Sequence, residues 1–146
     1  MKRRTWLQTM FAVPFFPLAG LAALRKQKAG PGPMSNTVYE LRVYRANEGK
    51  LDDLLRRFRE HTVKLFEKHG IKSVAYWTPV DEPQKGKTLI YILEHPSREA
   101  ATANWQAFRD DPDWVRVRDK SEENGKLVEK VDSTFMALTD FSPQLK

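Results

Sequence analysis

Cysteine is absent from the 146 residues of this sequence. Its absence excludes disulfide bonds, thiolate nucleophiles and zinc sites built from cysteine. A folded domain of this composition must therefore be stabilised by its hydrophobic core. The part of the chain that follows the first 33 residues is long enough for one such core.

Histidine is scarce as well, and the three imidazoles, His61, His69 and His95, lie far apart. None of them has the His-x-His or His-Glu-x-x-His spacing of a metal site. The glycine-rich loops that hold nucleotides and the Gly-x-Ser-x-Gly turn of hydrolases are also missing. We therefore expect neither a metal nor a cofactor.

Acidic residues are missing from residues 1–33, which hold 6 of the 25 basic residues. The formal net charge of +6 belongs entirely to this segment, because the remaining 19 basic residues balance 19 acidic ones. A domain of balanced charge has no net field to attract it to a phosphate backbone. The sequence therefore argues against a nucleic-acid partner.

The first residues have the order of a secretory signal. Arg3 and Arg4 precede Leu7 and an apolar run from Met10 to Leu24, which prolines interrupt and which is short for a membrane span. Twin arginines at this place are typical of a signal that a receptor reads. An uncleaved anchor or an amphipathic tail are the alternatives.

This layout predicts two parts and a location. Residues 1–33 are interpreted as leader and linker, and residues 34–146 as one domain, with a Gly/Pro-rich stretch at the boundary. We expect export to the periplasm or the extracellular space. Contact with a membrane is expected only through the leader, which would tether the protein if it is not cleaved.

Hydrophobic periodicity predicts four strands and helices between them. Asn47-Glu48-Gly49, Gly70, the turn-rich residues 81–86 and Asp110-Asp111-Pro112 separate the elements. The order is strand, helix, strand, strand, helical region, strand, which predicts an α+β, ferredoxin-like split β-α-β-β-α-β domain with an antiparallel four-stranded sheet. The expected strands are 37–45, 71–80, 87–95 and 128–141, and the expected helices are 50–69, one that Ser97 caps, and 113–124.

Such a domain covers one face of its sheet with helices and leaves the other face bare, so the bare face needs a partner. The first strand has two different faces. If Tyr39, Leu41 and Val43 face the helices, then Arg42 and Tyr44 face a second copy or a cavity between two copies. We therefore expect a homodimer with two-fold symmetry.

Four residues are candidates for ligand binding: Arg42, Tyr44, Trp77 and His95. The Arg42 guanidinium could hold a carboxylate or enolate oxygen, and Trp77 could line a cleft for a flat apolar molecule. His95 ends the third predicted strand. The structural alternatives stay open: an ion pair of Arg42 with Glu40 or Glu94, and aromatic side chains that belong to the core.

Several short motifs in this order resemble the NIPSNAP family, and the match spans nearly the whole domain. They are Val38-Tyr39-Glu40-Leu41-Arg42-Val43-Tyr44, Gly49-Lys50, His69-Gly70, Trp77, Arg98, Asp113-Trp114 and Phe141-Ser142-Pro143. The resemblance implies a dimeric α/β barrel, in which two ferredoxin-like subunits place their sheets face to face. It implies kinship with small monooxygenase-like and dehydratase-like barrels but no known reaction, and no catalytic residue is assigned. Ala75 and Glu94-His95-Pro96 depart from the family's pattern.

Three function classes remain open on this sequence. The favoured one is binding of a small molecule or a partner in a cleft between subunits. The enzyme alternative is a cofactor-independent monooxygenase or isomerase in the same cleft. The third is a structural or interaction module.

Overall fold

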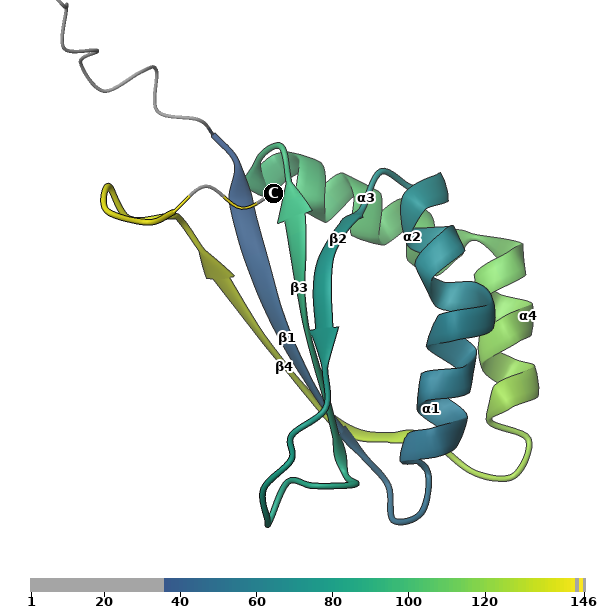
Figure 1. Ribbon diagram of the computed structural model, residues 1–146. Coiled ribbons are helices and arrows are strands. Elements are labelled where there is room, and N and C mark those ends of the chain that lie inside the picture. Colours follow the sequence, from purple (N-terminus) through teal and green to yellow (C-terminus); the bar gives the residue numbers. More distant parts are fainter. Residues whose placement is uncertain (1–35, 144, 146) are drawn as a thin grey trace, which may run out of the picture. The chain divides into compact units, whose positions relative to one another are not determined.

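Four strands form one antiparallel sheet in the computed structural model, which describes residues 36–143 and 145. They are β1 (Val38–Ala46), β2 (Lys72–Trp77), β3 (Thr88–His95) and β4 (Val128–Met136). Their order in the sheet is β2-β3-β1-β4 (Figure 1). With helices between β1 and β2 and between β3 and β4, this is the predicted ferredoxin-like α+β fold, and the prediction is confirmed.

The first helical segment runs without a break from Leu51 to Lys68 but changes its hydrogen bonding in the middle. It consists of α1 (Leu51–Arg57), the π-helix η1 (Phe58–Thr62) and α2 (Val63–Lys68). In η1 the Val63 N–H donates to the Phe58 carbonyl, five residues back. Gly70, at a φ of 68°, closes the segment in the left-handed conformation that favours glycine.

Two further helices follow β3, and side chains cap both. In α3 (Arg98–Asp110) the Ser97 hydroxyl accepts a hydrogen bond from the Ala100 N–H at 3.1 Å. In α4 (Pro112–Ser121) the Asp111 carboxylate accepts one from the Asp113 N–H at 2.8 Å, and Pro112 occupies the first turn. The predicted cap at Ser97 is confirmed, and the helix expected to start at 113 starts one residue earlier.

Two strands end before the predicted residue. β2 ends at Trp77 rather than at residue 80, because Pro79 has no N–H to add to the ladder. β4 ends at Met136 rather than at residue 141. Met136 pairs with Tyr39, next to the first residue of β1, so the residues after it have no neighbouring strand to bond.

All helices lie on one side of the sheet, and the hydrophobic core fills the space between (Figure 1). Leu89, Tyr91 and Leu93 of β3 point into this core, where they meet Phe58 and Phe66 of the helical segment. Among the described residues, no helix covers the opposite face of the sheet. That bare face carries Leu41, Val43, Ile90 and Ile92, which pair directly across β1 and β3.

Candidate functional site

The even-numbered residues of β1 point toward the helices. Tyr44 packs against Phe58 of η1, with ring centroids 5.9 Å apart, and Arg42 lies over the Trp105 ring of α3. The expectation that Tyr39, Leu41 and Val43 face the helices is therefore wrong, and Arg42 and Tyr44 do not lie on the bare face. Polar side chains can occupy the covered face because they bond to one another there.

Glu40 is the centre of this arrangement. It is 1% exposed, and its carboxylate accepts four hydrogen bonds. The Arg42 Nη1 donates to Oε1 at 2.9 Å and the Ser133 hydroxyl donates to the same oxygen at 2.6 Å. Oε2 accepts from the Trp105 indole at 2.6 Å and lies 3.2 Å from the His95 Nε2. We call Glu40, Arg42, Tyr44, Tyr91, His95, Trp105 and Ser133 the polar cluster.

The Glu40 carboxyl stays ionised despite its burial. Burial by itself raises the pKa of Glu40, but the hydrogen bonds from His95, Ser133 and Trp105, together with the Arg42 charge, outweigh it and lower the pKa to about 2. The ion pair between Arg42 and Glu40, which the sequence left as an alternative, is present. Glu94, the other carboxylate considered for Arg42, pairs with Lys72 instead, at 3.0 Å.

The Arg42 guanidinium lies close to two aromatic rings. Its guanidinium carbon lies 4.6 Å from the Trp105 centroid and 5.3 Å from the Tyr44 centroid, and its Nη2 donates to the Tyr44 hydroxyl at 3.0 Å. Burial alone would lower the pKa of Arg42, but Tyr44, Tyr91 and Glu40 raise it above its ordinary value. The guanidinium is therefore a fixed positive charge with a defined orientation.

Three buried polar atoms of the polar cluster make no hydrogen bond of good geometry among the described residues: the Arg42 Nε, the Tyr91 hydroxyl and the His95 Nδ1. The Tyr91 hydroxyl nevertheless lies close enough to Tyr44 and Arg42 for side-chain hydrogen bonding to both to affect its pKa. Arg42 and Tyr91 stand directly opposite each other on β1 and β3. Burial raises the pKa of Tyr91 well above its ordinary value, so this hydroxyl keeps its proton and can donate it. Unpartnered buried donors are costly and rare, which marks this spot as one that a further polar group could complete.

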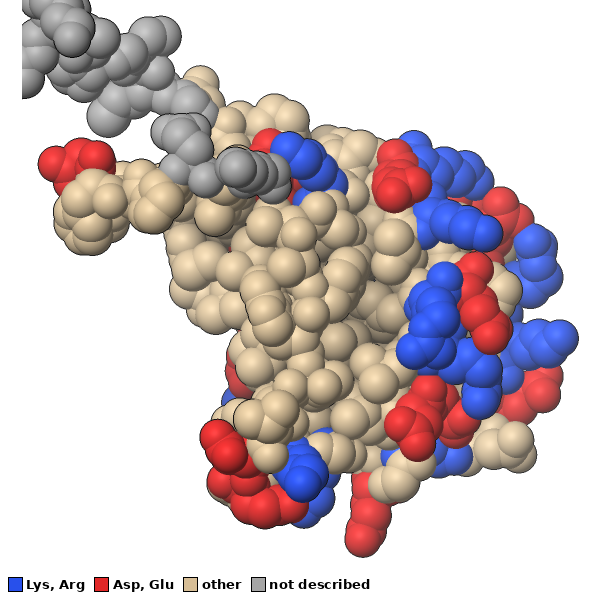
Figure 2. All heavy atoms as spheres, viewed as in Figure 1, with Lys and Arg blue, Asp and Glu red and all other residues tan. Residues whose placement is uncertain are grey.

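The polar cluster comes nearest to the surface on the side of β4, although Glu40, Tyr91 and His95 are themselves buried. The helices cover β3 and β1, whereas Ser133 and Val131 of β4 are exposed although they point to the same side of the sheet. The Arg42 side chain is 16% exposed and neighbours Ser133 in the sheet register. In Figure 2 the charged side chains gather over the helices and over the end of the molecule where the strand-connecting loops lie, while the surface between them is largely uncharged.

Of the four residues that the sequence singled out, three lie on the helix side and one does not. Arg42 and Tyr44 contact each other, and His95 joins them through Glu40. Trp77 pairs with Ile90 on the bare face and is 48% exposed. The structure therefore does not bring Trp77 together with the other three.

The structure adds Glu40, Trp105 and Ser133 to the candidate site. Glu40 was visible in the sequence only as a partner for Arg42, since the strand alternation places both on one face. Trp105 and Ser133 come from α3 and β4, more than sixty residues away in the chain. Contacts between residues so far apart in the chain depend on how α3 and β4 pack against β1. No local sequence pattern predicts that packing.

The export residues Arg3, Arg4 and Leu7 lie outside the described residues. Within residues 36–143 no helix is both long and apolar enough to span a bilayer. The same residues contain no group of three or more histidine, aspartate or glutamate side chains that could hold a metal ion.

The fold and the polar cluster define a ferredoxin-like α+β domain with a buried charged pair on its central strand. The NIPSNAP family model matches residues 39–143, and the chain belongs to this family. No match was found among curated proteins.

Solved structures with the same fold include several NIPSNAP proteins. An uncharacterised NIPSNAP-like domain protein from Burkholderia xenovorans aligns with a TM-score of 0.66 and 13% identity, over 77% of this chain and 93% of its own. A NIPSNAP family protein of unknown function from Agrobacterium tumefaciens gives 0.65 and 20%, over 77% and 96%. A protein from Nitrosomonas europaea described as a candidate antibiotic biosynthesis monooxygenase gives 0.52 and 9%, over 75% and 96%. At these identities the likeness shows the fold alone.

Proposed function

We propose that this NIPSNAP-family protein is exported and binds a small molecule at the polar cluster. The ligand would present a carbonyl or carboxylate oxygen to Arg42 and Tyr91. The observation that carries the proposal is that the Arg42 Nε and the Tyr91 hydroxyl, on directly opposed residues, are buried and make no hydrogen bond of good geometry, although the hydroxyl also lies near Tyr44 and Arg42. One oxygen with two lone pairs satisfies both.

The proposed place of binding differs from the one that the sequence suggested. A cleft between subunits would require Arg42 and Tyr44 on the bare face, and they lie on the helix side. The ligand site is therefore proposed within one subunit, between the sheet and α3. Trp77 has no part in this site.

Binding is favoured over catalysis by the state of the one imidazole in the cluster. A general base must reach the proton that it takes from the substrate. The His95 Nε2 lies 3.2 Å from the Glu40 carboxylate. The imidazole and the carboxylate, the two candidate bases of the polar cluster, are therefore engaged with each other, and this favours binding over catalysis.

Dimerisation through the bare face is the second part of the proposal. The paired side chains of Leu41 with Ile92 and of Val43 with Ile90 form an apolar surface that only a partner would remove from water. A second copy offers the same surface, and two-fold symmetry makes the contact self-complementary. The family's dimeric barrel has this face-to-face arrangement of sheets.

Export is the third part, and it rests on the sequence of the leader. Arg3, Arg4 and Leu7 precede the apolar run as in a twin-arginine signal. The protein would then work in the periplasm or outside the cell, with any membrane contact made by the leader.

Mass spectrometry under native conditions tests the ligand proposal. Protein purified in gentle buffer should carry an additional small-molecule mass, and Arg42→Lys and Tyr91→Phe should both lose it. Arg42→Lys keeps the charge beside Glu40 but lacks Nε, and Tyr91→Phe removes only the hydroxyl. Arg45→Lys, on the same strand but exposed, and Tyr39→Phe, on the opposite face, are the matched controls.

The stability of Tyr91→Phe separates the two possible roles of the hydroxyl. Without a ligand, removing an unpartnered buried hydroxyl is neutral or stabilising. With the ligand bound, the variant should melt below the wild type. A wild type that carries no small molecule, together with a Tyr91→Phe variant that melts at or above it, would refute ligand binding here.

A further inference from the structure

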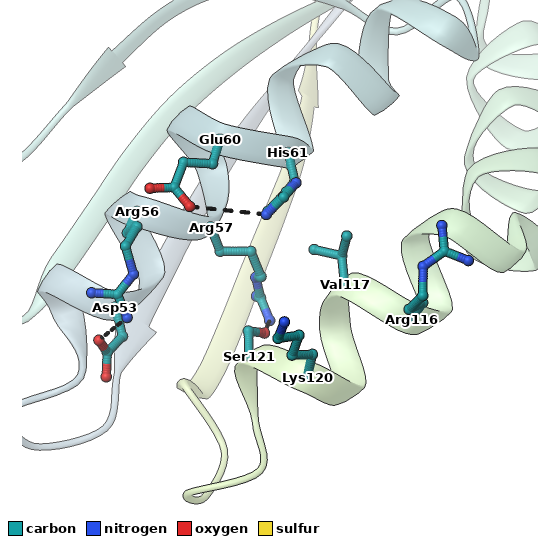
Figure 3. A pocket seen from close by; sticks show the side chains of 9 residues that line it. All are labelled: Asp53, Arg56, Arg57, Glu60, His61, Arg116, Val117, Lys120 and Ser121. Carbon is teal, nitrogen blue, oxygen red and sulfur yellow. Dashed lines mark hydrogen bonds and ion pairs between the residues drawn. The ribbon is translucent and has the colours of Figure 1, made fainter.

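A second site lies on the helical layer, away from the polar cluster. The segment α1–η1 and helix α4 flank a groove of about 460 Å³ (Figure 3). This volume is in the range of small-molecule sites. Its lining includes four cationic side chains and two carboxylates: Arg56, Arg57, Arg116, Lys120, Asp53 and Glu60.

Arg57 is the buried member of this lining. Its side chain is 5% exposed and reaches from α1 toward Ser121 of α4, to whose hydroxyl its Nη1 donates at 3.1 Å (Figure 3). The same Nη1 forms an ion pair with Glu122, directly after α4, at 3.0 Å. The Arg57 Nε is buried and has no partner among the described residues. A guanidinium held in one orientation with a free N–H is a preformed donor for an anion.

Lys120 supplies the second uncommitted donor. It is exposed, and no ion pair or hydrogen bond engages its ammonium group within the described part of the chain. Arg56 is paired with Asp53 at 2.6 Å, and Arg116 is paired with Asp113. An anion could therefore bind the Arg57 Nε and the Lys120 Nζ without breaking any existing ion pair.

The wall of the groove contains the π-helix. η1 begins directly after Arg57, and the Thr62 hydroxyl bonds to the Arg57 carbonyl at 3.3 Å. A π turn is rare in proteins and is found often at functional sites. Here it lies in the helix that positions Arg57.

We propose that this groove binds the phosphate group of a small phosphorylated molecule. A phosphate monoester carries about −1.5 to −2 charges at pH 7 and offers three acceptor oxygens, which could accept from the unpaired Lys120 ammonium group and from the Arg57 Nε, two groups whose side chains line this groove. The volume beyond Arg57 and Lys120 leaves space for the organic part of the molecule. This site is independent of the ligand proposed for the polar cluster.

Amide NMR on the full chain tests the proposal, with inorganic phosphate as the first probe and ribose 5-phosphate as the second. At constant ionic strength, phosphate should shift the amides of residues 53–61 and 116–122 in a saturable way. Ribose 5-phosphate should bind at the same amides at least as tightly as inorganic phosphate. Ribose without phosphate is the control for the organic part.

The charge-reversal variant Lys120→Glu should weaken the affinity for phosphate about tenfold or more. Lys64→Glu is the matched control, because Lys64 is exposed, lies outside the groove, and changes the net charge equally. Arg57→Lys is a second variant, which keeps the charge but removes the Nε donor, and it should weaken binding as well. The proposed site is wrong if Lys120→Glu and Lys64→Glu weaken phosphate binding equally. It is also wrong if phosphate shifts the amide signals of all basic surfaces alike. If inorganic phosphate binds and ribose 5-phosphate does not, the proposal that the ligand is a small phosphorylated molecule is wrong.

Discussion

Glu40 is a buried carboxylate whose partners come from β1, β3, α3 and β4, so its replacement should be costly. In Glu40→Gln the amide NH₂ would face donors instead of accepting from them, and Arg42 would lose its counter-charge. Breaking a buried pair of this kind costs about 3 to 5 kcal/mol. We expect a loss at the lower end, since Arg42 is partly exposed, and urea denaturation measures it.

Glu129→Gln is the control for this substitution. Glu129 is an exposed residue of β4, and its replacement should change the free energy of unfolding by about 0.5 kcal/mol or less. Equal stability of the two variants would show that the polar cluster does not hold Glu40 as described.

The lowered pKa of Glu40 also predicts how stability depends on pH. Its pKa is about 2 in the fold and 4.5 when unfolded, so the ionised group stabilises the fold above pH 4.5, and this contribution is lost as the pH falls from 4.5 toward 2. Asp111, whose pKa is lowered by Lys68 and His69, acts in the same direction. Urea midpoints measured across this range should fall more steeply for the wild type than for Glu40→Gln. Parallel curves would contradict the assignment.

At the scale of the element, the start of α3 depends on one side chain. Ser97→Ala removes the hydroxyl that accepts the Ala100 N–H and should cost about 1 kcal/mol. Ser97→Asp restores an acceptor at the cap and should stay within a few tenths of a kcal/mol of the wild type. Thermal melts of the three proteins compare them directly. If Ser97→Asp is as unstable as Ser97→Ala, Ser97 does not stabilise the fold by capping α3.

The elements themselves could be predicted from local patterns, but the face of β1 that is buried could not. Alternation separates Leu41 and Val43 from Arg42 and Tyr44, and hydrophobicity alone favours burial of the first pair. The structure buries the second face because Glu40 neutralises Arg42 and Trp105 comes across from α3. Those are tertiary contacts, and the hydrophobic periodicity of the sequence does not predict them. The same holds for the packing around the π-helix at Phe58–Thr62.

At the scale of the whole molecule, the bare face predicts the oligomeric state. Light scattering on the full chain at micromolar concentration should give twice the mass of one chain. Ile92→Lys places a charge in the centre of the bare face and should yield monomers. Val80→Lys, at a loop residue that is 78% exposed, should leave the dimer intact. A wild type that runs as a monomer would remove the barrel arrangement.

The twin-arginine pattern of the sequence predicts where the protein is found. Replacing Arg3 and Arg4 by lysine keeps the charge but removes the twin arginines, and the double variant should stay in the cytoplasm. Cell fractionation with an antibody to the protein measures this, and Lys2→Arg is a control that should still be exported. Unchanged export of the double variant would sink the twin-arginine interpretation.

The central position of β1 has a consequence for the order in which the chain folds. β1 is the first strand to be synthesised, yet its partner β4 is the last, and their ladder joins Tyr39 to Met136. Contacts of such high sequence separation form late and slow the folding of a domain. On the ribosome the sheet therefore cannot close until nearly the whole chain has emerged, so β1 must wait for its second neighbour until the last strand is made.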